Sequence, residues 1–228
     1  MMFTRYAIYY TPEPGPLASF GAGWLGWDAA MGRDCAHPDV PGLPDSVAAL
    51  TATPRKYGFH GTIKPPFRLA DGHSADDLAA ALTRLCATRA AVRLDGLGLT
   101  RIGRFLALTP LGDTRALADL AGAAVAGLDA FRAPATEAEL ARRRAGRLSD
   151  RQDALLVRWG YPYVMEEFRF HLTLTGPLDP AALQAAEAAL RPLVEGVAPG
   201  PVTVGDLTLL GEAEDGRFHH IARAALSG

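Results

Sequence analysis

The chain has 228 residues and a formal net charge of −2 at pH 7. Hydrophobic residues make up 49% of it, which is typical of a folded globular protein and excludes a disordered one. A near-neutral charge argues against tight binding to long nucleic acids, which requires a basic surface, but leaves small anionic substrates open.

The sequence carries no signal for a membrane or for secretion. No apolar stretch approaches the roughly 18–20 residues of a transmembrane helix. The first residues, MMFTRYAIYYTPEPG, lack the basic region, apolar run and cleavage site of a secretory signal. The two cysteines, Cys35 and Cys86, do not suggest a disulfide framework. We therefore expect a reduced, soluble, cytoplasmic protein with no membrane partner; the oligomeric state stays open.

The first half of the chain alternates strand and helix patterns. Aromatic and β-branched residues predict a strand at 5–10, and Gly and Pro interrupt the stretch that follows. Further elements are short helices near Trp24 and Ser46, a strand at 57–67 closed by Pro65-Pro66, a helix at 74–87 capped by Ser74, and strands at 92–103 and 104–110 with a turn at Gly103.

The second half begins with three predicted helices. One covers 113–131, and two capping-box patterns, at Thr136 and Ser149, start two more. A strand at 166–176, a helix at 179–194 and two strands within 202–226, joined at Asp215-Gly216, complete the chain.

A His-x-Thr triplet occurs twice, in GFHGTIKPPF and in RFHLTLTGPL. Each triplet is followed by a helix and then by two strands. From His60 to Phe105 is 45 residues, and from His171 to Phe218 is 47. This recurrence predicts an internal duplication, with repeats at about 1–103 and 104–228 within one domain of 228 residues. A pseudo-two-fold axis would bring the two triplets face to face.

The two triplets carry the residue types needed for phosphoryl chemistry. Side chains alternate faces along a strand, so Phe59, Gly61 and Ile63 should face the core, as should Phe168, Phe170, Leu172 and Leu174. The catalytic candidates His60, Thr62, His171 and Thr173 should then line a cleft. Each Thr hydroxyl can donate to a phosphoryl oxygen, and one neutral and one protonated imidazole can act as base and acid.

The paired segments FHGTI and FHLTL resemble the two-histidine phosphoesterase superfamily, which includes the 2′,3′-cyclic phosphodiesterases of the RNA ligase type. RYAIYYTPEPGPL, RKYGFHGTIKPPFRL, FRAPATEAELARRR and GYPYVMEEFRFHLTLTG are similar to an uncharacterised branch often encoded with phosphonate-degradation genes. The resemblance implies a bilobal α+β fold, with two pseudo-symmetric lobes of antiparallel sheet and flanking helices. It also implies a central cleft lined by the His-x-Thr strands, and metal-independent chemistry. His60, Thr62, His171 and Thr173 carry over from it directly.

Three further residues are candidates for substrate binding. Lys64 and Arg169 should share the faces of the two histidines. Tyr6 or Tyr9 on the first strand could stack on a base or sugar; the two point to opposite faces, and Tyr6 is taken as the candidate. The arginine cluster at 142–144 is interpreted as a solvated helix end, with an extra anion contact as the alternative.

The function predicted is hydrolysis of a cyclic phosphate or small phosphodiester, in an enzyme of the phosphoric diester hydrolase class, with a place in phosphonate metabolism. Small cyclic phosphates or nucleotides are the expected partners, and RNA ends are a further candidate. We expect no cofactor and no metal, because no ligand spacing typical of a metal site and no Walker-type loop is present. The alternatives are a non-catalytic binder of nucleotides or RNA ends, and metal-dependent hydrolysis through the two histidines.

Overall fold

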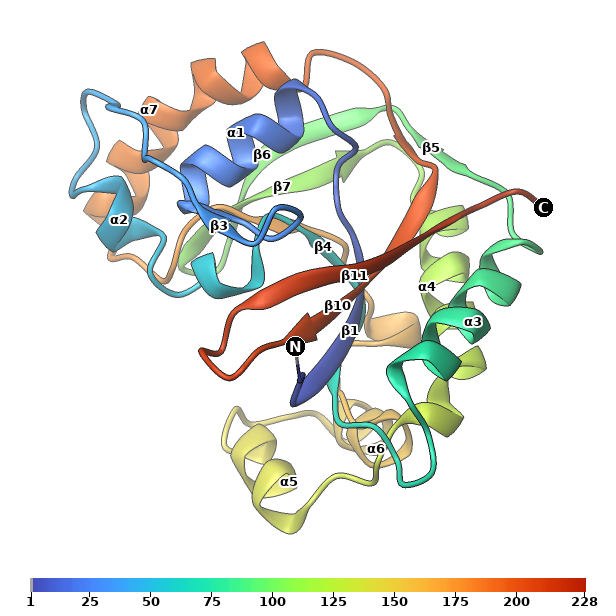
Figure 1. The fold of residues 1–228 in the computed structure, drawn as a ribbon. Helices are drawn as coiled ribbons and strands as arrows, with labels where there is room; N and C mark the ends of the chain where they lie inside the picture. The colour runs from blue at the N-terminus through green and yellow to red at the C-terminus, as the bar shows by residue number, and fades with distance from the viewer. Residues whose placement is uncertain (1) are drawn as a thin grey trace.

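The computed structural model describes residues 2–228 and has an α+β architecture, as the sequence predicts (Figure 1). Its centre is a seven-stranded sheet in the order β11-β10-β1-β4-β8-β7-β6, and every neighbouring pair in it is antiparallel. These strands are β1 (Arg5–Tyr10), β4 (Gly61–Phe67), β6 (Gly96–Ile102), β7 (Phe105–Leu111), β8 (Leu172–Thr173), β10 (Asp206–Glu212) and β11 (Phe218–Ala225).

Two smaller antiparallel pairs flank this sheet. β2 (Trp27–Asp28) pairs with β3 (Arg33–Asp34), and β5 (Val92–Leu94) pairs with β9 (Val202–Val204). The helices are α1 (Pro16–Leu25), α2 (Val47–Leu50), α3 (Ala75–Cys86), α4 (Arg115–Gly127), α5 (Glu137–Arg144), α6 (Asp150–Trp159) and α7 (Pro180–Val197). Single 3₁₀ turns lie at Arg55–Tyr57, Asp129–Phe131 and Met165–Glu167.

The strands and helices that follow each His-x-Thr triplet pack in a reciprocal way. α3 follows β4 and contacts β10 and β11, whereas α7 follows β8 and contacts β6 and β7. The hairpin β6–β7 lies beside β8, and β10–β11 lies on the side of β4, with β1 between them. This arrangement supports the predicted duplication, which remains a prediction.

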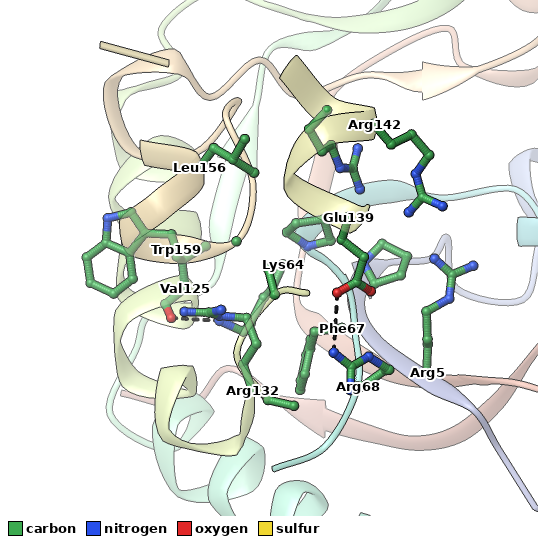
Figure 2. A pocket seen from close by; sticks show the side chains of 16 residues that line it. Arg5, Lys64, Phe67, Arg68, Val125, Arg132, Glu139, Arg142, Leu156 and Trp159 are labelled. Atoms are coloured by element: carbon green, nitrogen blue, oxygen red, sulfur yellow. Dashed lines mark hydrogen bonds and ion pairs between the residues drawn. The ribbon is translucent and has the colours of Figure 1, made fainter. Parts of the chain in front are cut away.

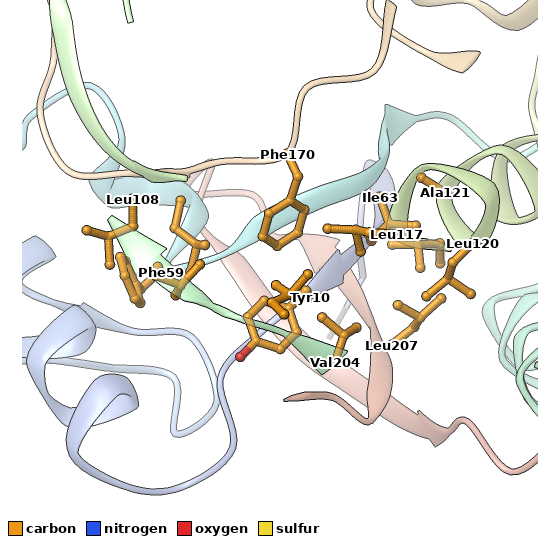
Figure 3. Packing of buried hydrophobic residues seen from close by; sticks show 14 of the residues in the cluster. Tyr10, Phe59, Ile63, Leu108, Leu117, Leu120, Ala121, Phe170, Val204 and Leu207 are labelled. Atoms are coloured by element: carbon orange, nitrogen blue, oxygen red, sulfur yellow. The ribbon is translucent and has the colours of Figure 1, made fainter. Parts of the chain in front are cut away.

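One face of the sheet is covered by helices and the other is open at its centre. Leu78 and Leu82 of α3 and Leu190 of α7 belong to the main core. Figure 3 shows Leu120 of α4 near Ile63 of β4 in the same core. The residues predicted to face the core do so: Phe59, Gly61, Ile63, Phe170, Leu172 and Leu174 are buried, and the partly buried Phe168 packs against the same core.

Local signals fix most helix starts. Ser74, Thr136 and Ser149 each accept a hydrogen bond from the backbone three residues on, and all three form full capping boxes. α6 ends at Gly160, whose φ of 75° is easily reached only by glycine. Cys35 and Cys86 are free thiols. No helix within residues 2–228 combines the length and the apolar composition required to cross a membrane.

Two strand predictions are wrong in extent. The strand expected at 57–67 begins only at Gly61, because a 3₁₀ turn at Arg55–Tyr57 and the positive φ of Gly58 precede it. It runs through Pro65-Pro66 to Phe67, since β8 pairs with β4 only at Gly61 and the prolines need no partner on that side. The strand expected at 166–176 is hydrogen-bonded as a strand only at Leu172–Thr173, and a 3₁₀ turn occupies its beginning.

Trp24 ties helix α1 to the second triplet. Its ring is fully buried, and its Nε1 donates a hydrogen bond of 2.7 Å to the carbonyl of Leu174, next to Thr173. We expect Trp24→Phe to lower the free energy of unfolding by about 1–3 kcal/mol, because the buried carbonyl loses its partner. Urea unfolding measures this, with Trp159→Phe as the control, since the indole of Trp159 donates no hydrogen bond within residues 2–228. Equal losses in both variants would contradict the assignment.

Candidate active site

The two triplets line two adjoining cavities on the open face of the sheet. His60, Thr62 and Thr173 line a cavity of about 320 Å³, and His171 lines an adjoining cavity of about 840 Å³. The two cavities share Thr62, Pro65, Phe105 and Tyr161, and we call them together the central cleft. The antiparallel pairing of Gly61 with Leu172 brings the triplets together.

A tight backbone turn positions His60. Gly58 has a φ of 70°, and a Cβ there would lie 2.7 Å from the Cβ of Ala29, so the turn requires glycine. The imidazole Nδ1 is 2.9 Å from the carbonyl oxygen of Gly58. Because a carbonyl only accepts, Nδ1 carries the proton and Nε2 is the acceptor in the neutral ring. The Thr62 hydroxyl, 3.2 Å from Nε2, therefore donates to it.

His171 has the same local geometry. Its Nδ1 lies 2.8 Å from the carbonyl oxygen of Arg169, two residues earlier, as His60 contacts Gly58. The same argument places the proton on Nδ1 and leaves Nε2 as the basic nitrogen of the neutral ring. The two histidines thus share one tautomer, set in each case by a backbone carbonyl.

Each imidazole packs against an aromatic ring. Tyr9 stacks on His60 with ring centroids 3.8 Å apart and an angle of 20°, and Phe105 lies 5.7 Å from His171. Burial lowers the pKa of His60 to about 4; its hydrogen bond to Gly58 opposes this, and repulsion from a protonated His171 adds to it. His60 is therefore neutral at pH 7.

The charges around the triplets favour an anion. The smaller cavity is lined by Arg5 and Arg143 and by no carboxylate. Arg169 lines the larger cavity, in which the Glu167 carboxylate accepts a hydrogen bond from Gln152. The Thr62 and Thr173 hydroxyls line the same space. This set can bind a phosphoryl group through hydroxyl and guanidinium donors while two imidazoles exchange protons with it.

Two predicted binding residues lie outside the central cleft. Lys64 is 2% exposed, and its Nζ donates to the carbonyl of Val125 at 3.0 Å and lies 3.5 Å from Asp129. Bulges in the pairing of β1 with β4 break the alternation that would place Lys64 beside Thr62. Tyr6 is on the core face, and its neighbour Tyr9 faces the cleft instead.

Several cleft residues come from distant segments that sequence reasoning did not connect to the triplets. Arg5 is on β1, Phe105 is on β7, and Arg143 and Tyr161 belong to the helical section after Phe131. The RRR run at 142–144 was the available signal for Arg143, which is half-buried and lines the smaller cavity, whereas Arg142 and Arg144 are exposed. The anion contact remains a prediction. No local sequence pattern indicated that Arg5, Phe105 and Tyr161 would reach the cleft.

The donors for a metal are not gathered in this cleft. Within residues 2–228, no group of three or more His, Cys, Asp or Glu side chains is arranged to hold a metal ion. The two imidazoles each use Nδ1 for a backbone carbonyl, so each could offer only Nε2 to a ligand. Metal independence remains a prediction.

Residues 62–219 match the family described as "Protein of unknown function (DUF1045)". The chain belongs to the DUF1045 family. The match includes Thr62, His171 and Thr173 and the helical section that carries Arg143.

Two curated relatives are both named "Ribose 1,5-bisphosphate phosphokinase PhnN". The protein from Janthinobacterium sp. (strain Marseille) is 40% identical over 219 residues, and that from Laribacter hongkongensis (strain HLHK9) is 40% identical over 207 residues. The alignments cover 93% and 85% of this chain but 48% and 47% of the relatives. The chain therefore spans about half the length of these curated relatives.

Solved structures of phosphoesterases are distantly similar to this DUF1045 chain. E. coli LigT complexed with 3′-AMP aligns over 100% of both chains with 14% identity and a TM-score of 0.45. A structure described as a phosphoesterase aligns over 99% of both chains with 16% identity and a TM-score of 0.42. Similarity at this level assigns no activity to the DUF1045 chain.

The pKa of His60 can be measured directly. We expect its imidazole to titrate near pH 4 rather than near 6.5, because burial disfavours the charged ring. NMR of the ring Cε1–H resonances against pH gives the value, with His60→Gln used to assign the signal. A midpoint close to that of a free imidazole would contradict the described environment.

Proposed function

We propose that this DUF1045 chain hydrolyses a cyclic phosphate or small phosphodiester by two-histidine acid–base catalysis. The observation that carries the proposal is the shared tautomer. In both rings Nδ1–H donates a hydrogen bond to a backbone carbonyl, which leaves the basic Nε2 atom of each ring available in the central cleft. A site with two matched imidazoles and hydroxyl donors suits in-line displacement at phosphorus, in which one proton is removed and another delivered.

In the proposed reaction, His60 is the base, because burial keeps it neutral. Its Nε2 removes a proton from water, and the water oxygen forms a bond to phosphorus. The bond from phosphorus to the leaving oxygen breaks, and His171, protonated on Nε2, delivers its proton to that oxygen. Water is thereby added across one P–O bond, and proton exchange with solvent resets both rings.

A phosphoryl group bound in the cleft would be compatible with this assignment of roles. A negative charge near an imidazole raises its pKa, so substrate would make His60 a stronger base than it is in the empty cleft. Thr62, which donates to Nε2 of His60 in the described structure, would turn its hydroxyl to a phosphoryl oxygen. Thr173 would bind a second phosphoryl oxygen from the opposite strand.

The substrate class is proposed from chemistry and from the relatives. The chain resembles the phosphonate-associated branch, and its relatives are named ribose 1,5-bisphosphate phosphokinase. Both observations favour phosphorylated ribose and its cyclic phosphates as the substrate class. The kinase activity in that name belongs to proteins about twice as long, and this sequence contains no Walker-type phosphate loop. We therefore propose hydrolysis rather than phosphorylation for this chain.

Turnover of a panel of cyclic phosphates tests the proposal. We expect hydrolysis of at least one ribose or nucleoside cyclic phosphate, unchanged by a chelator, because the cleft offers no carboxylate-rich metal site. Binding without turnover would favour the non-catalytic binder. Loss of activity on chelation, with recovery on adding a divalent ion, would favour metal-dependent hydrolysis.

Replacing each histidine tests the assigned roles. His60→Ala and His171→Ala should each reduce kcat/KM by roughly 10²–10⁴-fold, the usual contribution of an acid or base. The losses should not add in the double variant, because both groups act in one transition state. Thr62→Val and Thr173→Val should each cost about 1.5–3 kcal/mol of transition-state stabilisation. Circular dichroism controls for folding, and parental activity in either His→Ala variant would refute the mechanism.

A further inference from the structure

A second, strongly cationic pocket adjoins the central cleft. It is lined by six cationic side chains: Arg5, Lys64, Arg68, Arg132, Arg142 and Arg143 (Figure 2). It shares Arg5, Pro65, Pro66 and Arg143 with the cavity around His60. We call it the arginine pocket. The two cavities therefore lie side by side, with these residues between them.

Four of these cations contact three neighbouring carboxylates. Arg68 pairs with Glu139, and Arg5 pairs with Glu212 through a contact of 2.6 Å. Arg132 and Lys64 both contact Asp129. These ion pairs form the walls of the pocket. The two remaining cationic side chains are those of Arg142 and Arg143.

Arg142 and Arg143 have no carboxylate partner within 4.0 Å among residues 2–228, whereas the next residue, Arg144, pairs with Asp153 at 2.7 Å. Arg143 lies 4.4 Å over the ring of Tyr161, itself a residue of the central cleft. A wholly solvated helix end would not direct one guanidinium onto a cleft residue. Figure 2 shows Arg142 of α5 above the pocket and Arg5 of β1 on its right.

From this arrangement we infer that the arginine pocket binds a second phosphate, a phosphomonoester on the same molecule as the cyclic phosphate cut at the triplets. The inference rests on the proposed function. A phosphomonoester carries about −1.5 to −2 charges at pH 7 and accepts several hydrogen bonds, which matches two unpaired guanidiniums. The phosphodiester of an RNA chain carries a single charge and matches them less well.

The helical section at 132–165 then has a specific role. Thr136 and Glu139 cap the start of α5, and Arg68 on the segment after β4 pairs with Glu139. This anchorage holds the last turn of α5, with Arg142 and Arg143, beside the strand that carries Thr62. The section selects the substrate, whereas the triplets perform the chemistry.

Adenosine 2′,3′-cyclic phosphate and its 5′-phosphorylated form provide a matched pair of substrates. We expect the parent enzyme to prefer the 5′-phosphorylated form in kcat/KM, and Arg142→Gln to reduce that preference about 10-fold or more, the range of one charge-assisted hydrogen bond. Arg144→Gln removes the same charge two residues away, from a side chain that pairs with Asp153, and should leave the preference unchanged. No preference in the parent enzyme, or a stronger preference for a cyclic-phosphate-ended dinucleotide, would overturn the inference.

A binding measurement separates this inference from the proposed function. Isothermal titration of the His60→Ala/His171→Ala double variant with inorganic phosphate should show binding that Arg142→Gln weakens about 10-fold and Arg144→Gln does not, at constant ionic strength. That result supports the arginine pocket even if no cyclic phosphate is turned over. Binding that is equal in the two arginine variants would overturn it, whatever the activity.

Discussion

The active site depends on one close backbone contact between the two halves of the chain. Gly61 of β4 pairs with Leu172 of β8, and the ring of Phe170 lies where a Cβ on Gly61 would be, at 2.3 Å. Only glycine allows the two strands to meet with Phe170 packed across them. This pairing fixes the relative positions of the two His-x-Thr triplets, because it joins β4 directly to β8 within the sheet.

The chemistry of the cleft follows from how the backbone holds each imidazole. The backbone carbonyl two residues before each histidine accepts a hydrogen bond from Nδ1–H, so the tautomer is fixed without a buried carboxylate. Burial lowers the pKa of His60 and keeps the ring uncharged. Arg143 lines the same cavity without a carboxylate partner among residues 2–228 and offers positive charge to an anion. In the proposed mechanism the two tasks are separate: the imidazoles exchange protons and the arginines bind negative charge.

Local patterns in the sequence predicted most of the fold, and non-local packing accounts for most of what they missed. Capping boxes and alternating apolar residues gave the helices and the buried faces of both triplet strands correctly. Lys64 and Tyr6 were misplaced because strand bulges and the choice of face depend on the neighbouring strand, which a single sequence does not reveal. Arg5 and Tyr161 reach the cleft from segments far along the chain, so no local signal marked them.

A crystal structure with inorganic phosphate would test the central claim most directly, namely that the two triplets act on one phosphorus atom. The account predicts a phosphate in the central cleft, between the Nε2 atoms of His60 and His171, with the Thr62 and Thr173 hydroxyls on its oxygens. A phosphate bound by only one triplet, with the other imidazole beyond hydrogen-bonding reach, would contradict a shared two-histidine site.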